Sequence, residues 1–255
     1  MLTGNVHSIQ TMGTLDGPGI RYVLFVQGCP FRCLFCHNPD TWNILGDVSK
    51  KSGDSLKYGV SNQKSVDFLV EDVLKYKKFF ESSNGGVTVS GGEPLLQIPF
   101  LTEFFKKLKE NEIHTAIDTC GYVDLSDNLD KLIGYTDLFL LDIKHLNSDK
   151  HRELTGKDND KVLKFLEHIN SLNKKIWIRQ VLVPDWTMDD DYIEELIKFL
   201  KNYNIEKVEL LPYHEMGKEK YKKLGISYRL KTRIPTKEEV EKIRKNFIEN
   251  GFDTV

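Results

Sequence analysis

Three of the four cysteines in this 255-residue chain lie within eight positions of one another. They are Cys29, Cys33 and Cys36, and they follow the apolar run 20–26 directly. Thiolates at this C-x3-C-x2-C spacing can ligate three irons of a cubane [4Fe–4S] cluster and leave the fourth iron without a protein ligand. An open iron on a redox-active cluster can bind a substrate and pass it an electron. The spacing therefore predicts a cluster that takes part in chemistry.

Other uses of these cysteines stay open on spacing alone. Cys29, Cys33, Cys36 and His37 could ligate zinc, although the adjacent pair Cys36 and His37 would wrap one ion poorly. The sequence Cys33-Leu-Phe-Cys36-His37 also matches the C-x-x-C-H site of covalent haem, which leaves Cys29 without a use. Disulfides are disfavoured by a single short loop in a reducing compartment. The fourth cysteine, Cys120, has the character of a small buried hydrophobe, and no role is assigned to it.

The composition excludes several classes of protein. Apolar residues make up 40% of the chain, charged residues 29%, and the net charge is −2, so no global field favours nucleic acid or an anionic membrane. No apolar run approaches the length of a membrane span, and the N-terminus lacks the pattern of a signal peptide. We therefore expect a cytoplasmic protein. Without repeats or an interdomain linker, residues 1–255 are expected to form a single domain.

Short β-rich runs alternate with longer amphipathic stretches along the chain. Strands are predicted at 21–26, 86–89, 114–118, 138–142, 175–183 and 207–211, and helices at 66–80, 99–111, 160–173, 190–202 and 237–249. Thr236 and Glu239 form a capping box that starts the last helix. The alternation predicts an α/β fold with a parallel sheet, and six units fit an open (β/α)6 partial TIM barrel. The polar, cysteine-free stretch 46–64 is predicted to be a surface loop.

Polar motifs follow the predicted strands, where barrel enzymes carry their active sites. In chain order these motifs are the cysteine loop, Ser90-Gly91-Gly92-Glu93-Pro94, Asp118-Thr119-Cys120-Gly121, Asp142-Ile143-Lys144-His145, and Pro212-Tyr213-His214. Arg179 lies inside the fifth strand, where a buried guanidinium requires an acidic partner or a ligand carboxylate. We expect these residues to converge on one rim beside the cluster.

Each motif has a chemical and a structural interpretation. The paired glycines allow close approach of a ligand, and carbonyls beside Glu93 can accept hydrogen bonds from a cationic amino group, but a tight turn ending at Pro94 explains them too. Asp118, Thr119 and Asp142 carry oxygens that suit a hard cation, or else they cap the following helices.

Together these motifs resemble those of the glycyl-radical-enzyme activases of the radical S-adenosylmethionine (SAM) superfamily. The matching pieces run through nearly the whole chain in one order: Asp16-Gly-Pro-Gly19 with Arg21, Cys29 through Trp42, Ser90 through Pro94, Asp118-Thr119 with Gly121, Leu141 through Lys144, Arg179 with 181–184, and Leu210 through His214. Family members often carry Asn at the position of Cys120.

The resemblance implies one [4Fe–4S] cluster on Cys29, Cys33 and Cys36, a bound SAM, and Asp16 facing an incoming glycine loop. It implies a SAM pocket lined by Phe35, Asn38, Gly91, Gly92, Glu93, Lys144, Arg179 and His214. It also implies a monovalent cation, Na⁺ or K⁺, held by Asp118, Thr119, Asp142 and the carbonyl of Leu140.

The activity that the resemblance implies is hydrogen abstraction from one glycine of a partner enzyme. The expected protein substrate is a pyruvate formate-lyase, and the expected reductant is flavodoxin or ferredoxin. The activase is expected to be a monomer, with neither nucleic acid nor membrane as a partner. Activation of another glycyl radical enzyme, or radical chemistry on a small molecule, would use the same motifs and stays an alternative.

Overall fold

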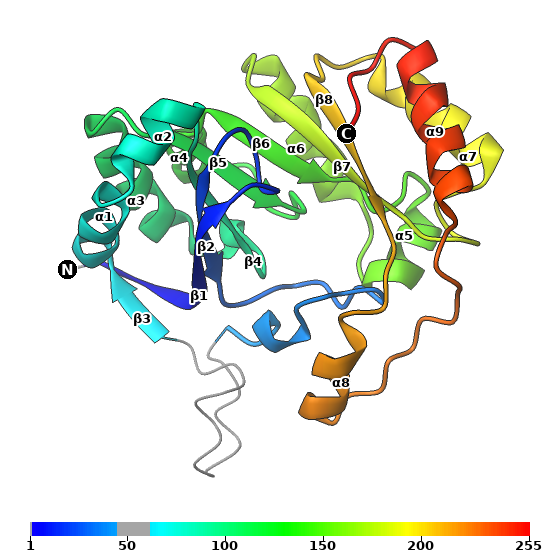
Figure 1. Ribbon diagram of the computed structural model, residues 1–255, viewed down its shortest axis with the longest axis horizontal. Coiled ribbons are helices and arrows are strands. Elements are labelled where there is room, and N and C mark those ends of the chain that lie inside the picture. The colour runs from blue at the N-terminus through cyan, green and yellow to red at the C-terminus, as the bar shows by residue number, and fades with distance from the viewer. Residues whose placement is uncertain (1, 45–61) are drawn as a thin grey trace. The chain divides into compact units, whose positions relative to one another are not determined.

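The computed structural model describes residues 2–44 and 62–255 (Figure 1). The chain divides into two compact units. The first comprises Met1–Pro30, Asp40–Thr119 and Val123–Phe139, and the second comprises Phe31–Pro39, Cys120–Tyr122 and Leu140–Val255. The cysteine loop therefore begins in the first unit and continues in the second. The single domain expected for residues 1–255 stays a prediction.

Among its described residues, the first unit contains five strands in the order β3-β1-β2-β4-β5. Their bounds are β1 Thr3–Gly13, β2 Arg21–Val26, β3 Asn62–Ser65, β4 Gly86–Gly91 and β5 His114–Thr119. Strands β2, β4 and β5 are parallel, as the alternation of elements predicted. Strand β1 was not predicted and pairs antiparallel with both β2 and β3. The sheet is therefore mixed, because β1 joins the parallel strands in the antiparallel sense and β3 follows it at the edge.

The described part of the first unit also contains the helices α1 Val66–Leu74, α2 Lys77–Ser83, α3 Ile98–Glu110 and α4 Asp127–Gly134. Helix α3 packs against α1, α4 and β5, and it buries Phe100, Phe104 and Leu108 (Figure 1). The predicted helix 99–111 is thus confirmed within a residue at each end. Helix α4 was not predicted.

The single helix predicted at 66–80 is wrong, because the chain breaks between α1 and α2. The break at Tyr76 lets its ring pack against that of Tyr22, with 5.8 Å between the ring centroids. The Tyr22 hydroxyl also donates to Asp72 in the last turn of α1, at 2.8 Å. A contact with the buried ring of Tyr22 thus overrides the helical periodicity of the sequence.

The second unit contains the strands β6 Leu138–Asp142, β7 Lys175–Leu182 and β8 Lys207–Pro212, although β6 starts with two residues of the first unit. They follow one another in the order β6-β7-β8, and β7 and β8 are parallel. The helices are α5 Ser148–Thr155, α6 Asp160–Ser171, α7 Asp190–Leu200, α8 Lys218–Leu224 and α9 Lys237–Glu249. The predicted capping box of Thr236 and Glu239 is confirmed at the start of α9. Helices α5 and α8 were not predicted.

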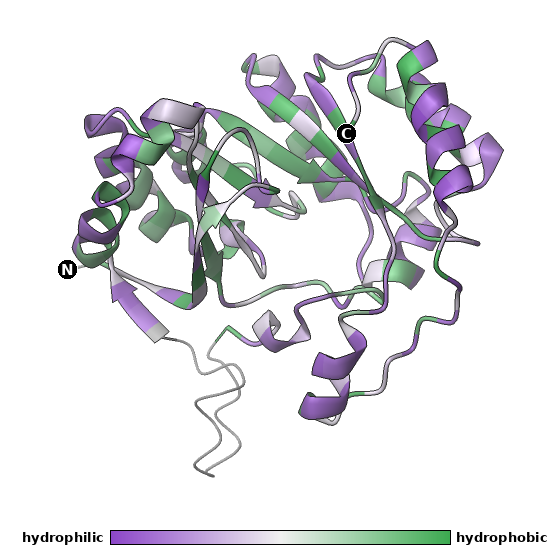
Figure 2. Ribbon diagram, in the orientation of Figure 1, coloured by the Kyte–Doolittle hydropathy of each residue, from purple (hydrophilic) through white to green (hydrophobic). Residues whose placement is uncertain are grey.

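Burial follows the amphipathic patterns of the sequence. Helix α7 buries Tyr192, Ile193 and Leu196 on one face while its acidic residues stay exposed. Figure 2 shows the same division, with largely apolar strands and helices of mixed colour. Most of the predicted loop 46–64 lies outside the described residues. Its end is wrong, because Asn62–Ser65 form strand β3. Within residues 2–44 and 62–255, no helix has the length and apolar character needed to cross a membrane.

Candidate active site

The paired glycines of the first unit form a turn that only glycine fits. Gly91 has φ +108°, and a Cβ there would lie 2.5 Å from the amide nitrogen of Val26. A Cβ on Gly92 would lie 2.1 Å from the carbonyl oxygen of Gly28. The amide of Glu93 donates to that same carbonyl at 2.6 Å. The turn is therefore fixed against the residue that precedes the first cysteine.

Glu93 is fully buried and its carboxylate is held in one orientation. Its Oε1 accepts hydrogen bonds from the amide of Leu95, at 2.9 Å, and from the hydroxyl of Thr119, at 2.6 Å. Beside it, the hydroxyl of Ser90 donates to Asp118 Oδ2 at 2.7 Å. The structure thus brings together the predicted site residues at the ends of β4 and β5. A buried, oriented carboxylate can bind a cationic group strongly.

The first cysteine is positioned by the chain that returns after the cysteine loop. The amide of Cys29 donates to the carbonyl of Trp42 at 3.1 Å. The buried side-chain amide of Gln27 donates to the carbonyls of Asp40 and Asn43, at 2.8 and 2.7 Å. Gln27 was not predicted as a site residue. A glutamine directly after an apolar strand was the feature of the sequence that could have indicated it. These bonds fix the backbone around the first predicted iron ligand.

In the second unit, the other two cysteines lie in a tight turn. The amide of Cys36 donates to the carbonyl of Cys33 at 3.1 Å, and the amide of Leu34 donates to the carbonyl of Leu154 at 2.8 Å. The turn therefore lies along the end of α5. Both thiols are reduced and half-buried, so a metal can reach them. Soft thiolates at this spacing suit iron–sulfur ligation.

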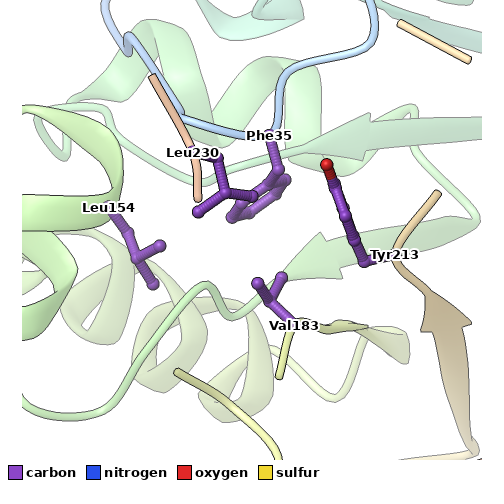
Figure 3. Close-up of a cluster of buried hydrophobic side chains, with 5 residues drawn as sticks. All are labelled: Phe35, Leu154, Val183, Tyr213 and Leu230. Atoms are coloured by element: carbon purple, nitrogen blue, oxygen red, sulfur yellow. The ribbon is translucent and has the colours of Figure 1, made fainter. Parts of the chain in front are cut away.

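Phe35 anchors the cysteine turn in an apolar cluster. Figure 3 shows its ring among Leu154, Val183, Tyr213 and Leu230, all buried. Cys33 packs against the edge of this cluster. The prediction that Phe35 keeps this loop dry is consistent with that packing. A dry surrounding also influences the potential of any cluster bound here.

The ammonium group of Lys144 lies beside the same turn. Lys144 Nζ lies 2.8 Å from Asp142 Oδ2 and 5.5 Å from the centroid of the Phe35 ring. Burial lowers the pKa of Lys144, but the Asp142 carboxylate and the Cys33 thiolate outweigh it and hold the pKa above its ordinary value. Lys144 therefore stays charged and stabilises the thiolate form of the turn.

His37 and His214 form a stacked pair in the second unit, with ring centroids 4.0 Å apart. His37 Nε2 lies 3.2 Å from the carbonyl oxygen of His214 and donates to it. Burial, followed by the charge of His214, lowers the pKa of His37. Since His37 is engaged here, it is poorly placed as the fourth ligand of a zinc ion. In the part of the chain that the structure describes, no three His, Cys, Asp or Glu side chains gather around a position for one ion.

Arg179 has the acidic partner that its buried position requires. It lies opposite Glu209 in the register of β7 and β8, and its Nε donates to Glu209 Oε2 at 2.6 Å. Sequence analysis missed Glu209, although a glutamate inside an apolar strand was the available signal. Asn38, another predicted pocket residue, accepts a hydrogen bond from Lys220 of α8 at 2.7 Å.

Asp16 lies in a turn that a hydrogen bond from Thr88 holds in place. The hydroxyl of Thr88 donates to the Asp16 carbonyl at 2.6 Å and accepts from Arg21 Nε at 2.9 Å. Arg21 is fully buried and also lies 3.2 Å from His114 Nδ1. Burial lowers the pKa of Arg21 to about 9, against the attraction of Asp137 and Asp16, so the guanidinium stays charged at neutral pH. Thr88 and His114 were not singled out from the sequence.

The predicted cation ligands are divided between the two units. Asp118 and Thr119 belong to the first, and Leu140 and Asp142 to the second. The cation site stays a prediction, and so do the roles of the SAM-pocket residues.

Comparison with known proteins identifies the class. The profile of the Radical SAM superfamily matches residues 23–200. The structure of Streptococcus suis SuiB bound to precursor peptide SuiA is similar over 91% of this chain and 48% of that chain, with a TM-score of 0.65 at 18% identity. The predicted α/β fold of radical SAM type is confirmed, and the six strands from β2 and β4 to β8 are consistent with a partial barrel. The matching profile and the fold together define a radical SAM enzyme.

The more similar relatives narrow this class. The chain is 48% identical over 248 residues to a pyruvate formate-lyase-activating enzyme of Staphylococcus epidermidis, covering 95% of this chain and 94% of the relative. It is 47% identical over 236 residues to that of Staphylococcus aureus, covering 90% and 89%. A solved domain of the Bacteroides vulgatus enzyme has a TM-score of 0.57 at 25% identity, over 67% of this chain and 98% of that one. The chain belongs to the radical SAM superfamily and, within it, to the family of pyruvate formate-lyase-activating enzymes.

Proposed function

We propose that the chain activates a pyruvate formate-lyase by removing a hydrogen atom from one of its glycines. The observation that carries the proposal is the turn of Cys33 and Cys36, whose half-buried thiols lie beside the charge of Lys144. The names of the relatives, which match over most of their length, supply the partner.

In this proposal Cys29, Cys33 and Cys36 hold one [4Fe–4S] cluster. The donor set fits, because three soft thiolates favour iron and a nearby ammonium favours the thiolate form. When bound, the cluster and SAM supply a 5′-deoxyadenosyl radical by one-electron cleavage of the S–C5′ bond. Cysteines that ligate iron as thiolates require a reducing compartment, which supports the cytoplasm as the place of the reaction.

The chain's polar residues bind and orient SAM. Glu93 accepts hydrogen bonds from the cationic amino group, and the glycine turn beside it lets the backbone approach closely. Arg179 attracts the carboxylate, and His214 donates to the ribose or adenine. The oxygens of Asp118, Thr119 and Asp142, with the Leu140 carbonyl, would hold a monovalent cation.

The remaining roles concern the protein substrate, the exclusion of water and the supply of the electron. Asp16 presents its carboxylate to the incoming glycine loop, on a turn that Thr88 and Arg21 hold in place. The apolar cluster around Phe35 excludes water from the reacting groups. A flavodoxin or ferredoxin delivers the electron, and the activase works as a monomer.

Electron paramagnetic resonance tests the proposal directly. Iron-loaded, reduced protein is combined with SAM and a pyruvate formate-lyase under strict anoxia. A glycyl-radical signal that requires SAM and is lost in Cys36→Ala, but kept in the matched variant Cys120→Ala, would support it. Release of 5′-deoxyadenosine without any radical on the partner would refute the proposed substrate. SAM cleavage by Cys36→Ala would refute the proposed cluster.

A further inference from the structure

The segment between β8 and α9 has a charge unlike the rest of the chain. Residues 213–236 contain seven Lys and Arg against two Glu, whereas the whole chain has a net charge of −2. Four of the seven are lysines of the short helix α8. Figure 2 shows this helix as strongly hydrophilic. A local positive field on an acidic protein attracts acidic partners and orients them during encounter.

This basic segment is packed directly on the cysteine turn. A Cβ on Gly217 would lie 3.1 Å from the carbonyl oxygen of Cys36. The hydroxyl of Tyr221, a residue only 3% exposed, lies 3.5 Å from the carbonyl of Cys33. Lys220 reaches the same loop through Asn38. Only one layer of residues therefore separates the outer face of α8 from two of the three predicted cluster ligands.

The lysines of α8 divide into two groups. Lys218 is paired with Glu215 and lies over the ring of Tyr228, and Lys220 is held by Asn38. Lys222 and Lys223 are exposed on the outer side of the helix. The inner lysines thus fix the helix on the turn, while the outer pair presents charge to the solvent.

We propose that the outer face of α8 is the docking surface for a small acidic electron-carrier protein. The inference rests on the proposed cluster chemistry, which requires one electron from outside for each SAM cleaved. One electron leaves the carrier and one reaches the cluster, with no atom transferred. Electron transfer weakens steeply with distance, and a carrier docked on α8 would lie close to the turn of Cys33 and Cys36. The lysine pair supplies the charge complementarity that brings an acidic carrier there.

Equilibrium binding tests the docking surface without relying on turnover. Oxidised flavodoxin is titrated calorimetrically into the full-length protein at low salt. The double variant Lys222→Glu/Lys223→Glu should bind about tenfold more weakly or worse, since both charges are reversed. The matched control Lys164→Glu/Lys198→Glu makes the same charge change on exposed positions of α6 and α7 and should bind within about twofold of the unaltered protein.

A second readout separates this inference from the proposed function. With reduced flavodoxin as donor, the α8 variant should release 5′-deoxyadenosine more slowly, whereas a photochemical reductant should restore the rate. Unchanged flavodoxin binding would overturn the inference. So would a variant that binds flavodoxin normally but fails to modify the glycine partner, because the surface would then serve the protein substrate. If the unaltered protein binds flavodoxin through α8 but forms no glycyl radical, the docking surface stands and the proposed function fails.

Discussion

Arg179 and Glu209 lie directly opposite each other in the parallel strands β7 and β8, with 2.6 Å between Nε and Oε2. Both side chains are about nine-tenths buried. A buried charge is tolerated only when it is paired, so the two residues depend on one another for the stability of the fold. The pair also fixes the orientation of the Arg179 guanidinium in the sheet.

Removing Glu209 alone should be more damaging than removing both partners. Glu209→Leu removes the carboxylate that faces the buried guanidinium and should lower the free energy of unfolding by about 3–5 kcal/mol. The double variant Arg179→Met/Glu209→Leu should recover most of this loss. Urea denaturation of the three proteins measures the coupling, and strictly additive effects would contradict the buried pair.

The same double variant tests the role of Arg179 toward SAM. If the guanidinium attracts the SAM carboxylate, the stable double variant should bind SAM about tenfold more weakly or worse, in line with the loss of a charged hydrogen bond. Equilibrium dialysis against SAM measures this affinity. Unchanged affinity would show that Arg179 is structural only.

The glycine turn should tolerate no side chain. Gly92→Ala would place a Cβ 2.1 Å from the Gly28 carbonyl, and Gly91→Ala would also strain a backbone at φ +108°. Each substitution should lower the free energy of unfolding by about 2 kcal/mol or more. Gly134→Ala is the matched control, because nothing lies within 4 Å of the added Cβ in α4, and it should stabilise by up to about 1 kcal/mol. Equal effects at Gly92 and Gly134 would contradict the close approach.

Glu93→Gln should separate ligand binding from stability. The glutamine keeps an Oε1 that can accept from Leu95 and Thr119, so unfolding should change little. Loss of the negative charge should weaken SAM binding about tenfold or more. The exposed Glu110→Gln on α3 is the control and should leave the affinity unaltered. A Gln variant with full SAM affinity would remove Glu93 from the proposed pocket.

His145 should make the fold sensitive to acid. Burial, followed by the charge of Lys150, lowers the pKa of His145 from its model-peptide value of 6.5 to about 4, and its Nδ1 accepts from the amide of Asn147 at 2.9 Å. The unfolded chain therefore binds the proton first. The stability that neutral His145 contributes is complete above pH 6.5 and is lost as the pH falls toward 4, by roughly 3 kcal/mol in all.

His145→Asn should reduce that pH dependence, since an amide oxygen can accept from Asn147 without titrating. Denaturation at several values between pH 7 and pH 5 should give a flatter curve for the variant. His37 and His151 also have lowered pKa values because they are buried, so a smaller slope should remain. Parallel curves for the two proteins would contradict the role of His145.

Local features of the sequence predicted many of the strands and helices. Strand β2 and helix α9 match their predicted bounds, because an apolar run and a capping box are complete within a few residues. Strand β1 was missed, since its polar residues gain order only by pairing with β2 and β3. The wrong prediction of one helix over α1 and α2 has the same cause, because the contact between Tyr76 and Tyr22 is tertiary.

In the candidate site, too, local sequence features were predictable and tertiary contacts were not. Residue type and spacing were enough to single out the cysteines, Glu93 and Arg179. The pairing of Arg179 with Glu209, of Arg21 with Thr88 and of Gln27 with Asp40 could not be predicted, because the folding of segments distant in sequence decides which polar groups meet. Helix α8 was missed because its seven residues bury little besides Tyr221.

The central claim is hydrogen transfer from a partner glycine, and isotope transfer tests it most directly. A pyruvate formate-lyase labelled with α-deuterated glycine is incubated anaerobically with the iron-loaded, reduced protein and SAM. Mass spectrometry then measures the deuterium content of the 5′-deoxyadenosine released. The proposal predicts one deuterium in the product, in step with the glycyl radical formed on the partner. Product that carries no deuterium while the partner gains no radical would contradict it.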